Sequence, residues 1–202
     1  SRAMPAKSAA SAYLSLVYLT MGQFDDANFQ KAYNEAKDLI GKEGIYNLGL
    51  EPDFQNLYKA STIDASLEPI FVLDFTGSNS GDQGRDYQGA FTGIRSDERY
   101  KNASGGNSGG GWSVQVPALK VFREWSAQDY RRDVTFDDTA IHNGVVVPYT
   151  IFTTGNGDAV NRPHVAKYTR MSDGTATEGN NRASQSNYMM MRYAEVLLLG
   201  AE

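Results

Sequence analysis

Aromatic and polar side chains are interleaved in residues 77–113, a long glycine-rich stretch that has neither helical nor strand periodicity. Trp112 follows three consecutive glycines and precedes a serine, so no amphipathic pattern accounts for its burial. An exposed aromatic ring can cover the apolar C–H face of a sugar, while amide, carboxylate and guanidinium groups bind the surrounding hydroxyls. The candidate contacts for such a ligand are Trp112, Tyr87, Tyr100, Phe91, Arg85, Arg95 and Asn102. In the alternative interpretation, Trp112 only anchors the loop onto the core.

The same stretch contains the pattern Gly-x-Ser-x-Gly at residues 106–110, which is typical of serine hydrolases. His142 and His164 come later in the chain, with acidic residues in between. The nucleophile elbow of these enzymes requires a strand that leads into the serine and a helix that leaves it. Residues 101–105 lack strand character, and the glycines after the serine weaken any helix. We therefore expect no catalytic residue and no enzymatic activity.

Metal and cofactor chemistry has little support in the sequence. The two histidines fall in different predicted segments and form no ligand pair, and the acidic residues lack the spacing of a calcium loop. The chain has no cysteine, which excludes a disulfide framework and a zinc thiolate site. We expect no metal site and no cofactor. A pair of carboxylates for glycoside cleavage stays open, because sequence spacing selects no pair among the 24 acidic residues.

Composition and charge limit the classes of partner. The 202 residues are 41% hydrophobic, which is enough for a globular core. The net charge is -5 and there is no run of five or more like charges, so neither nucleic acid nor an anionic membrane surface is an expected partner. No apolar run reaches the roughly 18 residues of a membrane span. The last residues follow a helical pattern without a Gly, Asn or Pro stop, so we expect the protein to continue beyond them.

The clearest helical periodicity lies in residues 1–42, which we expect to form two amphipathic helices joined by a short turn. The first helix ends at Gly22 and carries on one face Ala10, Leu14, Val17, Tyr18 and Met21. The second ends at Gly41 and carries on one face Phe29, Ala32, Tyr33, Ala36, Leu39 and Ile40.

Five positions of this pair have the spacing of a tetratricopeptide repeat, in which large residues interlock with a small one: Leu14, Ser15, Tyr18, Gly22 and Phe24. The first position of the repeat, usually a Trp, is Ser11 here, and the turn is longer than usual. A plain helical hairpin is the other interpretation.

The remaining chain changes character twice. Residues 43–186 form an irregular, loop-rich region with predicted strands at 69–76, 145–153 and 164–170 and one helix at 117–126. Residues 187–202 are apolar almost all round a helix, and we expect them to be the first, truncated helix of a further pair. Within it, Arg192 and Glu195 are three residues apart and are expected to form a structural ion pair. The predicted fold is mainly α with an irregular α+β region: tetratricopeptide-like helix pairs packed against a loop-rich half with short strands.

Several motifs occur in a characteristic order. The opening helix is rich in alanine and leads through Tyr18 into Gly22-Gln23-Phe24, and the strand-like Pro69-Ile70-Phe71-Val72 follows. Pro117 starts a helix that is followed by an Asp-x-Arg-Arg turn at residues 129–132. The chain closes on Arg192-x-Ala194-Glu195-x-x-Leu198-x-x-Ala201-Glu202. In this order the motifs resemble the SusD/RagB family of outer-membrane glycan-binding lipoproteins, and they cover essentially the whole chain. The closing motif is the most specific, and Gly200 within it departs from the large residue usual in the family.

The resemblance implies an internal piece of a longer protein, built on a tetratricopeptide scaffold with an irregular half. It implies non-catalytic binding of an oligosaccharide or polysaccharide on the outward-facing surface of the outer membrane. A lipid on an N-terminal cysteine outside this chain would anchor the protein, and a SusC-like TonB-dependent porin would receive the ligand. The family's glycan contacts have no fixed motif, so the candidate residues rest on the physical argument alone.

Two other functions are weighed against this one. The same helix pair also suits a tetratricopeptide-type protein-interaction module without a sugar role. A hydrolase is the remote alternative, for which the Gly-x-Ser-x-Gly pattern is the sole sequence feature.

Overall fold

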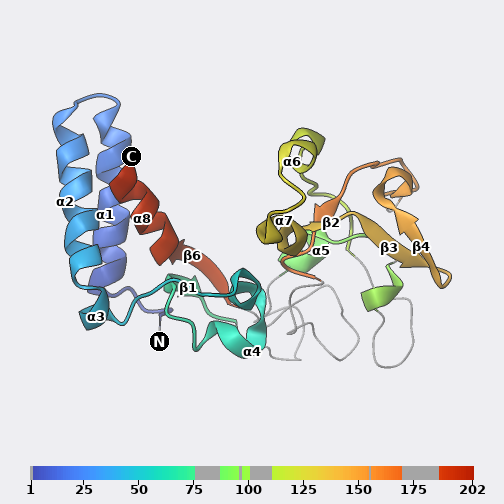
Figure 1. Cartoon of the computed structure of the whole chain (residues 1–202), viewed down its shortest axis with the longest axis horizontal. Helices are drawn as coiled ribbons and strands as arrows, with labels where there is room; N and C mark the ends of the chain where they lie inside the picture. Colours follow the sequence, from blue (N-terminus) through green and yellow to red (C-terminus); the bar gives the residue numbers. More distant parts are fainter. Residues whose placement is uncertain (1, 76–86, 96, 101–110, 155, 170–186) are drawn as a thin grey trace. The chain divides into compact units, whose positions relative to one another are not determined.

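The computed structural model describes residues 2–75, 87–95, 97–100, 111–154, 156–169 and 187–202 (Figure 1). The chain divides into two compact units. The helical unit comprises residues 1–52, 65–74 and 187–202, and the loop-rich unit comprises residues 53–64 and 75–186. Within the described ranges, no helix has the length and apolar character needed to cross a membrane.

The helical unit begins with a hairpin of two helices, α1 (Lys7–Gly22) and α2 (Ala27–Gly41), which lie side by side in Figure 1. The turn closes because the backbone N–H groups of Phe24 and Asp25 both donate to the carbonyl oxygen of Met21. The carboxylate of Asp25 in turn accepts from the N–H of Ala27 at 3.1 Å. The predicted helix pair in residues 1–42 is confirmed.

Small residues make the interface of this hairpin. Ala12, Ser15 and Ala36 are fully buried, and the Ser15 hydroxyl donates to the carbonyl oxygen of Ala32 at 2.9 Å. Of the large residues on the predicted apolar face, Val17 remains 50% exposed and Met21 45% exposed. Because small side chains let two helices approach closely, packing buries the alanine and serine face and leaves the large side chains outside.

Gly22 lies where the ring of Phe29 covers the end of α1. A Cβ atom at position 22 would be 2.7 Å from Cζ of Phe29 and closer to two other ring atoms, so we expect Gly22→Ala to destabilise the protein. Phe29 is 44% exposed and its ring can turn aside, so the expected cost is about 1 kcal/mol, the low end for an overpacked contact. A Cβ on Gly41, the last residue of α2, would meet nothing within 4 Å, so Gly41→Ala is expected to be neutral or to stabilise by up to about 1 kcal/mol. Thermal unfolding compares the two variants. Equal midpoint temperatures would contradict the close contact between Gly22 and the Phe29 ring.

A two-stranded antiparallel sheet joins distant parts of the chain within the helical unit. Strand β1 (Pro69–Leu73) pairs with β6 (Tyr188–Arg192). Helix α8 (Tyr193–Ala201) continues directly from β6 and packs against α1 and α2 (Figure 1). The strand predicted at residues 69–76 is confirmed over its first five positions. Residues 188–192 were predicted as helix and are a strand, because their backbone pairs with β1 before the helix begins.

The ion pair at this junction differs from the predicted one. Arg192 Nη1 lies 3.0 Å from Oε1 of Glu68. The other carboxylate oxygen of Glu68 accepts from the N–H of Glu51 at 2.8 Å. The prediction of an Arg192–Glu195 pair assumed that both residues share a helical face. Arg192 instead ends β6, so the spacing of three residues does not bring them together.

Short helix α3 (Glu43–Tyr46) follows the hairpin and ends at Asn47, which adopts a left-handed conformation with φ 53°. The Tyr193 hydroxyl donates to the carboxylate of Glu43 at 2.6 Å. One core then unites the helices with the sheet: Ala9, Ala12, Ala36, Leu39, Leu48, Ile70, Met191, Tyr193 and Val196.

Short elements alternate with turns in the loop-rich unit. Its described helical segments are η1 (Phe54–Tyr58), α4 (Ala60–Ile63), α5 (Gln88–Thr92), η2 (Glu98–Tyr100), α6 (Leu119–Glu124), α7 (Tyr130–Thr135) and η3 (Tyr149–Ile151). Its described strands form two antiparallel pairs, β2 (Phe136–Asp137) with β5 (His164–Val165) and β3 (Thr139–His142) with β4 (Val145–Pro148). The predicted class, a helical scaffold with an irregular region of short strands, is confirmed.

The predicted elements of this unit are shorter in the structure. The helix expected at 117–126 is α6. The strand expected at 145–153 ends as β4 at Pro148, and the next three residues form the helical turn η3. The strand expected at 164–170 is reduced to β5. Proline has no N–H to donate to a neighbouring strand, which fits the end of β4.

Candidate functional site

Four of the predicted ligand-binding residues lie at the junction of two segments of the loop-rich unit. Phe91 on α5 and Trp112 make an edge-to-face contact with ring centroids 5.3 Å apart and an interplanar angle of 80°. Tyr87 precedes α5 and lies one helical turn before Phe91. Arg95 follows α5 and donates its backbone N–H to Ser113 Oγ at 3.2 Å. We call Tyr87, Phe91, Arg95 and Trp112 the Trp112 platform.

The platform keeps aromatic surface accessible. Phe91 is 37% exposed, and Tyr87 and Trp112 are partly buried. The other predicted contacts cannot be placed: Arg85 and Asn102 lie outside the described residues, and of Tyr100 only the backbone, in η2, is described. The Gly-x-Ser-x-Gly pattern at 106–110 also lies outside the described residues.

A ladder of backbone hydrogen bonds fixes the platform. The N–H of Gly111 donates to the carbonyl oxygen of Ile94 at 2.7 Å, and the N–H of Trp112 donates to that of Ala90 at 2.6 Å. Further bonds run from Ser113 to Gly93 and from both Val114 and Gln115 to Phe91. The segment that carries Trp112 is thereby held along the end of α5.

Two glycines allow this close approach. A Cβ on Gly111 would overlap the backbone of Gly93, and a Cβ on Gly93 would lie 3.1 Å from the Cα of Gly111 and 2.6 Å from the carbonyl oxygen of Gly89. Any side chain at either position would push the two backbones apart. The glycine-rich run before Trp112 is therefore a packing requirement at Gly111.

Residues 97–100 are held in the same unit by a second set of bonds. The carboxylate of Glu98 accepts from the N–H groups of Asn143 and Gly144, at 2.7 and 3.0 Å. Buried Asp97 accepts from the N–H of Ile141 at 3.1 Å and forms an ion pair with Arg99 at 2.5 Å. Ile141, Asn143 and Gly144 lie on the β3–β4 hairpin or its turn, so this hairpin anchors residues 97–100, as the ladder to α5 anchors residues 111–115.

A serine and a histidine also meet in this unit, although not the serine of the hydrolase pattern. His164 Nε2 lies 2.9 Å from Ser113 Oγ, and His164 Nδ1 lies 3.1 Å from the carbonyl oxygen of Arg162. Ser113 is 5% exposed and His164 is fully buried, so a substrate has no access to the hydroxyl. The orienting partner is a backbone carbonyl in the position that a carboxylate holds in a hydrolase triad. The geometry fits a structural hydrogen bond that joins two segments of the unit.

Sequence reasoning missed Ser113 and His164 as a pair. They are 51 residues apart in the chain, and no local spacing links them. The single available signal was that His164 begins a predicted strand, where a buried imidazole needs a hydrogen-bond partner.

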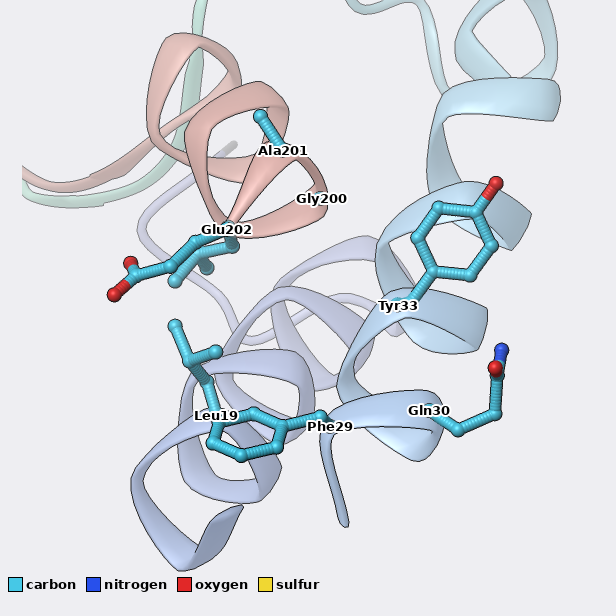
Figure 2. A pocket seen from close by; sticks show the side chains of 8 residues that line it. Leu19, Phe29, Gln30, Tyr33, Gly200, Ala201 and Glu202 are labelled. Carbon is cyan, nitrogen blue, oxygen red and sulfur yellow. The ribbon is translucent and has the colours of Figure 1, made fainter. Parts of the chain in front are cut away.

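A small cavity of about 310 Å³ opens in the helical unit, where the ends of α1 and α8 meet the start of α2 (Figure 2). Its lining residues are Leu19, Phe29, Gln30, Tyr33, Leu199, Gly200, Ala201 and Glu202. Gly200 lets α8 approach α2 closely, because a Cβ there would lie 3.3 Å from Cβ of Ala36. The departure of Gly200 from the family pattern is thus matched by a small neighbour. Its walls combine aromatic and aliphatic side chains with the polar groups of Gln30, Tyr33 and Glu202.

Comparison with known proteins gives sequence and structural relatives. No protein-family model matches the chain. SusD-like protein P2 from Formosa agariphila is 49% identical over 205 residues, which cover 100% of this chain and 38% of that protein. The chain therefore spans less than half the length of this curated relative.

Solved structures share the fold along nearly the whole chain. A SusD homologue from Bacteroides thetaiotaomicron has a TM-score of 0.67 at 20% identity, covering 97% of this chain and 40% of that one. Surface glycan-binding protein A from Bacteroides uniformis has a TM-score of 0.69 at 22% identity, covering 98% and 37%. NanU from B. fragilis has a TM-score of 0.65 at 20% identity, covering 96% and 39%. At these identities the likeness establishes the fold.

Proposed function

Because the chain belongs to the SusD family, we propose that this protein binds an oligosaccharide through the Trp112 platform and does not cleave it. The observation that carries the proposal is the Phe91–Trp112 ring pair, which the backbone ladder holds at the surface of the loop-rich unit. Rings fixed before the ligand arrives lose little conformational freedom on binding, which favours affinity. The name of surface glycan-binding protein A, one of the structural relatives, supports the same class of ligand.

Arg95 supplies the polar group that the platform needs. Its backbone is fixed by Ser113, while its side chain is partly exposed. A guanidinium group offers five N–H donors in a planar fork, which suits pairs of neighbouring sugar hydroxyls. We extend the proposal to Arg85, Tyr100 and Asn102, which come from the same stretch of sequence.

The proposal also covers the setting of the protein. We propose an outward-facing lipoprotein of the outer membrane that passes its ligand to a SusC-like TonB-dependent porin. Membership of the family supports this location and this partner. Affinity purification of the full-length protein from an outer-membrane extract tests it: a large β-barrel transporter is the expected partner, and recovery of a soluble protein alone would contradict it.

Removal of the Trp112 ring is expected to weaken oligosaccharide binding by roughly ten-fold or more, because the apolar sugar face loses its main contact. Isothermal titration calorimetry of the full-length protein, first against a panel of plant, host and microbial glycans, measures the affinity of Trp112→Ala for the best ligand. Tyr130→Ala is the matched control, because Tyr130 is a 50% exposed aromatic residue of the same unit outside the platform.

Two results would count against the proposal. Equal affinity of Trp112→Ala and the unmodified protein would remove Trp112 from the site. No binding across the panel, or release of reducing sugar during incubation, would contradict the function itself.

The helix pair of α1 and α2 supports a second candidate, a protein-interaction module of the tetratricopeptide type. Phe29 and Tyr33 on α2 are each 44% exposed. An exposed apolar surface of this kind is common at protein contacts. A soluble partner whose recovery is lost in Tyr33→Asp and kept in Trp112→Ala would favour this function.

A further inference from the structure

The Ser113 hydroxyl joins three separate parts of the loop-rich unit. It accepts from the N–H of Arg95 at 3.2 Å and lies 2.9 Å from Nε2 of His164 on β5. The backbone N–H of the same residue donates to the carbonyl oxygen of Gly93. Ser113 also adopts φ 55°, a left-handed conformation that residues other than glycine rarely take. A buried serine in this conformation must be held there by its surroundings.

The direction of each hydrogen bond follows from the groups involved. The carbonyl oxygen of Arg162 can only accept, so the Nδ1 atom of His164 carries the proton. In the neutral imidazole, Nε2 is then an acceptor, and the Ser113 hydroxyl donates to it. The hydroxyl is 3.5 Å from the carbonyl oxygen of Gly93, which makes His164 the better acceptor. Each hydrogen-bonding group of the pair is satisfied in this arrangement.

We propose that Ser113 and His164 are positioning residues for the Trp112 platform: their hydrogen bond holds the left-handed turn at Ser113 and thereby the direction in which Trp112 leaves the backbone. The platform's role in ligand binding rests on the proposed function, whereas the positioning of Trp112 does not. Trp112 immediately precedes Ser113, and its ring reaches Phe91. Loss of the hydrogen bond therefore leaves the strained turn next to the ring held by the backbone ladder alone.

Burial, and not a neighbouring charge, is the main influence on the pKa of His164. Asp137 lies directly opposite in the β2–β5 pairing, and its carboxylate lies 3.6 Å from Nη1 of Arg99. Phe152 packs against the imidazole with ring centroids 5.3 Å apart. Burial lowers the pKa of His164 from 6.5 to about 4, an effect that the Arg162 carbonyl partly opposes.

The sign of the resulting pH dependence follows from linkage. In the unfolded chain the imidazole binds its proton near pH 6.5, whereas the folded protein binds it only near pH 4. Between these values the unfolded state holds more protons, so stability is complete above about pH 6.5 and falls as the pH is lowered toward 4. The folded-to-unfolded ratio changes by up to roughly 300-fold over this window. Protonation also removes the acceptor for Ser113.

The test uses the full-length protein labelled with 5-fluorotryptophan, in which the ¹⁹F resonance of Trp112 is identified by its loss in Trp112→Phe. His164→Leu keeps the bulk and removes the acceptor, so the Trp112 resonance is expected to shift or broaden. His164→Gln offers an amide oxygen near the position of Nε2 and is expected to retain the native resonance. Ser113→Ala removes the hydroxyl and leaves a side chain that disfavours the left-handed turn, so it is expected to behave like His164→Leu.

A second readout is ligand affinity, for which we expect a loss of about ten-fold in His164→Leu and recovery in His164→Gln. An unchanged Trp112 resonance in both His164→Leu and Ser113→Ala would overturn the positioning role. If the resonance shifts but neither the unmodified protein nor any variant binds a glycan, the proposed function is contradicted and the positioning role stands. If His164→Leu does not fold, a pH series decides: the resonance should move as the pH approaches 4 in the unmodified protein and stay fixed in His164→Gln.

Discussion

Gly111→Ala is expected to lower the free energy of unfolding by about 3–5 kcal/mol. This is the largest effect that we expect of the glycine-to-alanine substitutions considered. The added Cβ would overlap the carbonyl oxygen, carbonyl carbon and Cα of Gly93. Backbone atoms cannot turn aside as the end of a side chain can, so the clash must separate the two segments. The hydrogen bonds from Gly111 to Ile94 and from Trp112 to Ala90 would then lengthen or break.

Hydrogen exchange measures this effect where it arises. In Gly111→Ala the amide protons of residues 111, 112 and 113 are expected to lose most of their protection, and chemical denaturation gives the overall cost. Gly144→Ala is the matched control in the same unit. A Cβ at position 144 would meet nothing within 4 Å, but φ is +75°, so about 1 kcal/mol of backbone strain is expected there. Equal losses in the two variants would refute the close crossing.

Glu68→Leu is expected to destabilise the helical unit by about 2–4 kcal/mol. The Glu68 side chain is 4% exposed, and the Arg192 guanidinium is 31% exposed. Removal of the carboxylate leaves Arg192 without its partner and takes the acceptor from the N–H of Glu51. The upper end of the usual range for a buried pair is not reached, because Arg192 retains partial access to water.

Glu195→Gln is the control for this experiment, because the spacing of the sequence predicted Glu195 as the partner of Arg192. We expect its effect to stay within about 0.5 kcal/mol. A double-mutant cycle with Arg192→Met adds a test of the pair itself: the double variant should lose less than the sum of the single variants. Additive losses, or a larger loss in Glu195→Gln than in Glu68→Leu, would contradict the assigned pairing.

Local sequence signals predicted the helical hairpin well. The periodicity of residues 1–42, with Gly22 and Gly41 at the two ends, is set by interactions within one or two helical turns. The sequence did not predict correctly which face of α1 is buried. Alanine, serine and glycine pack against α2 while Val17 and Met21 stay partly exposed, because the closeness of two helices depends on both partners and not on the hydrophobicity of one.

Local sequence signals predicted the strands less well than the helices. The strand at 69–76 was recognised, but its partner β6 was predicted as helix. Residues 188–192 are apolar, and a short apolar run fits a buried helix as well as a strand. Pairing with β1, more than one hundred residues earlier in the chain, decides between them. The same pairing places Arg192 next to Glu68 and away from the face of α8.

The candidate site divides in the same way. Trp112, Phe91, Tyr87 and Arg95 were selected from the sequence because aromatic and polar residues gather in one loop-rich stretch, and chemistry of that kind can be read from composition. The Phe91–Trp112 contact, the crossing of Gly93 and Gly111 and the Ser113–His164 hydrogen bond depend on which distant segments meet. The sequence alone predicted the hairpin and the family, and it suggested the class of ligand-binding chemistry that we propose. Tertiary structure decided which atoms touch, because contacts between residues far apart in the chain are set by packing of the whole unit and leave no local periodicity.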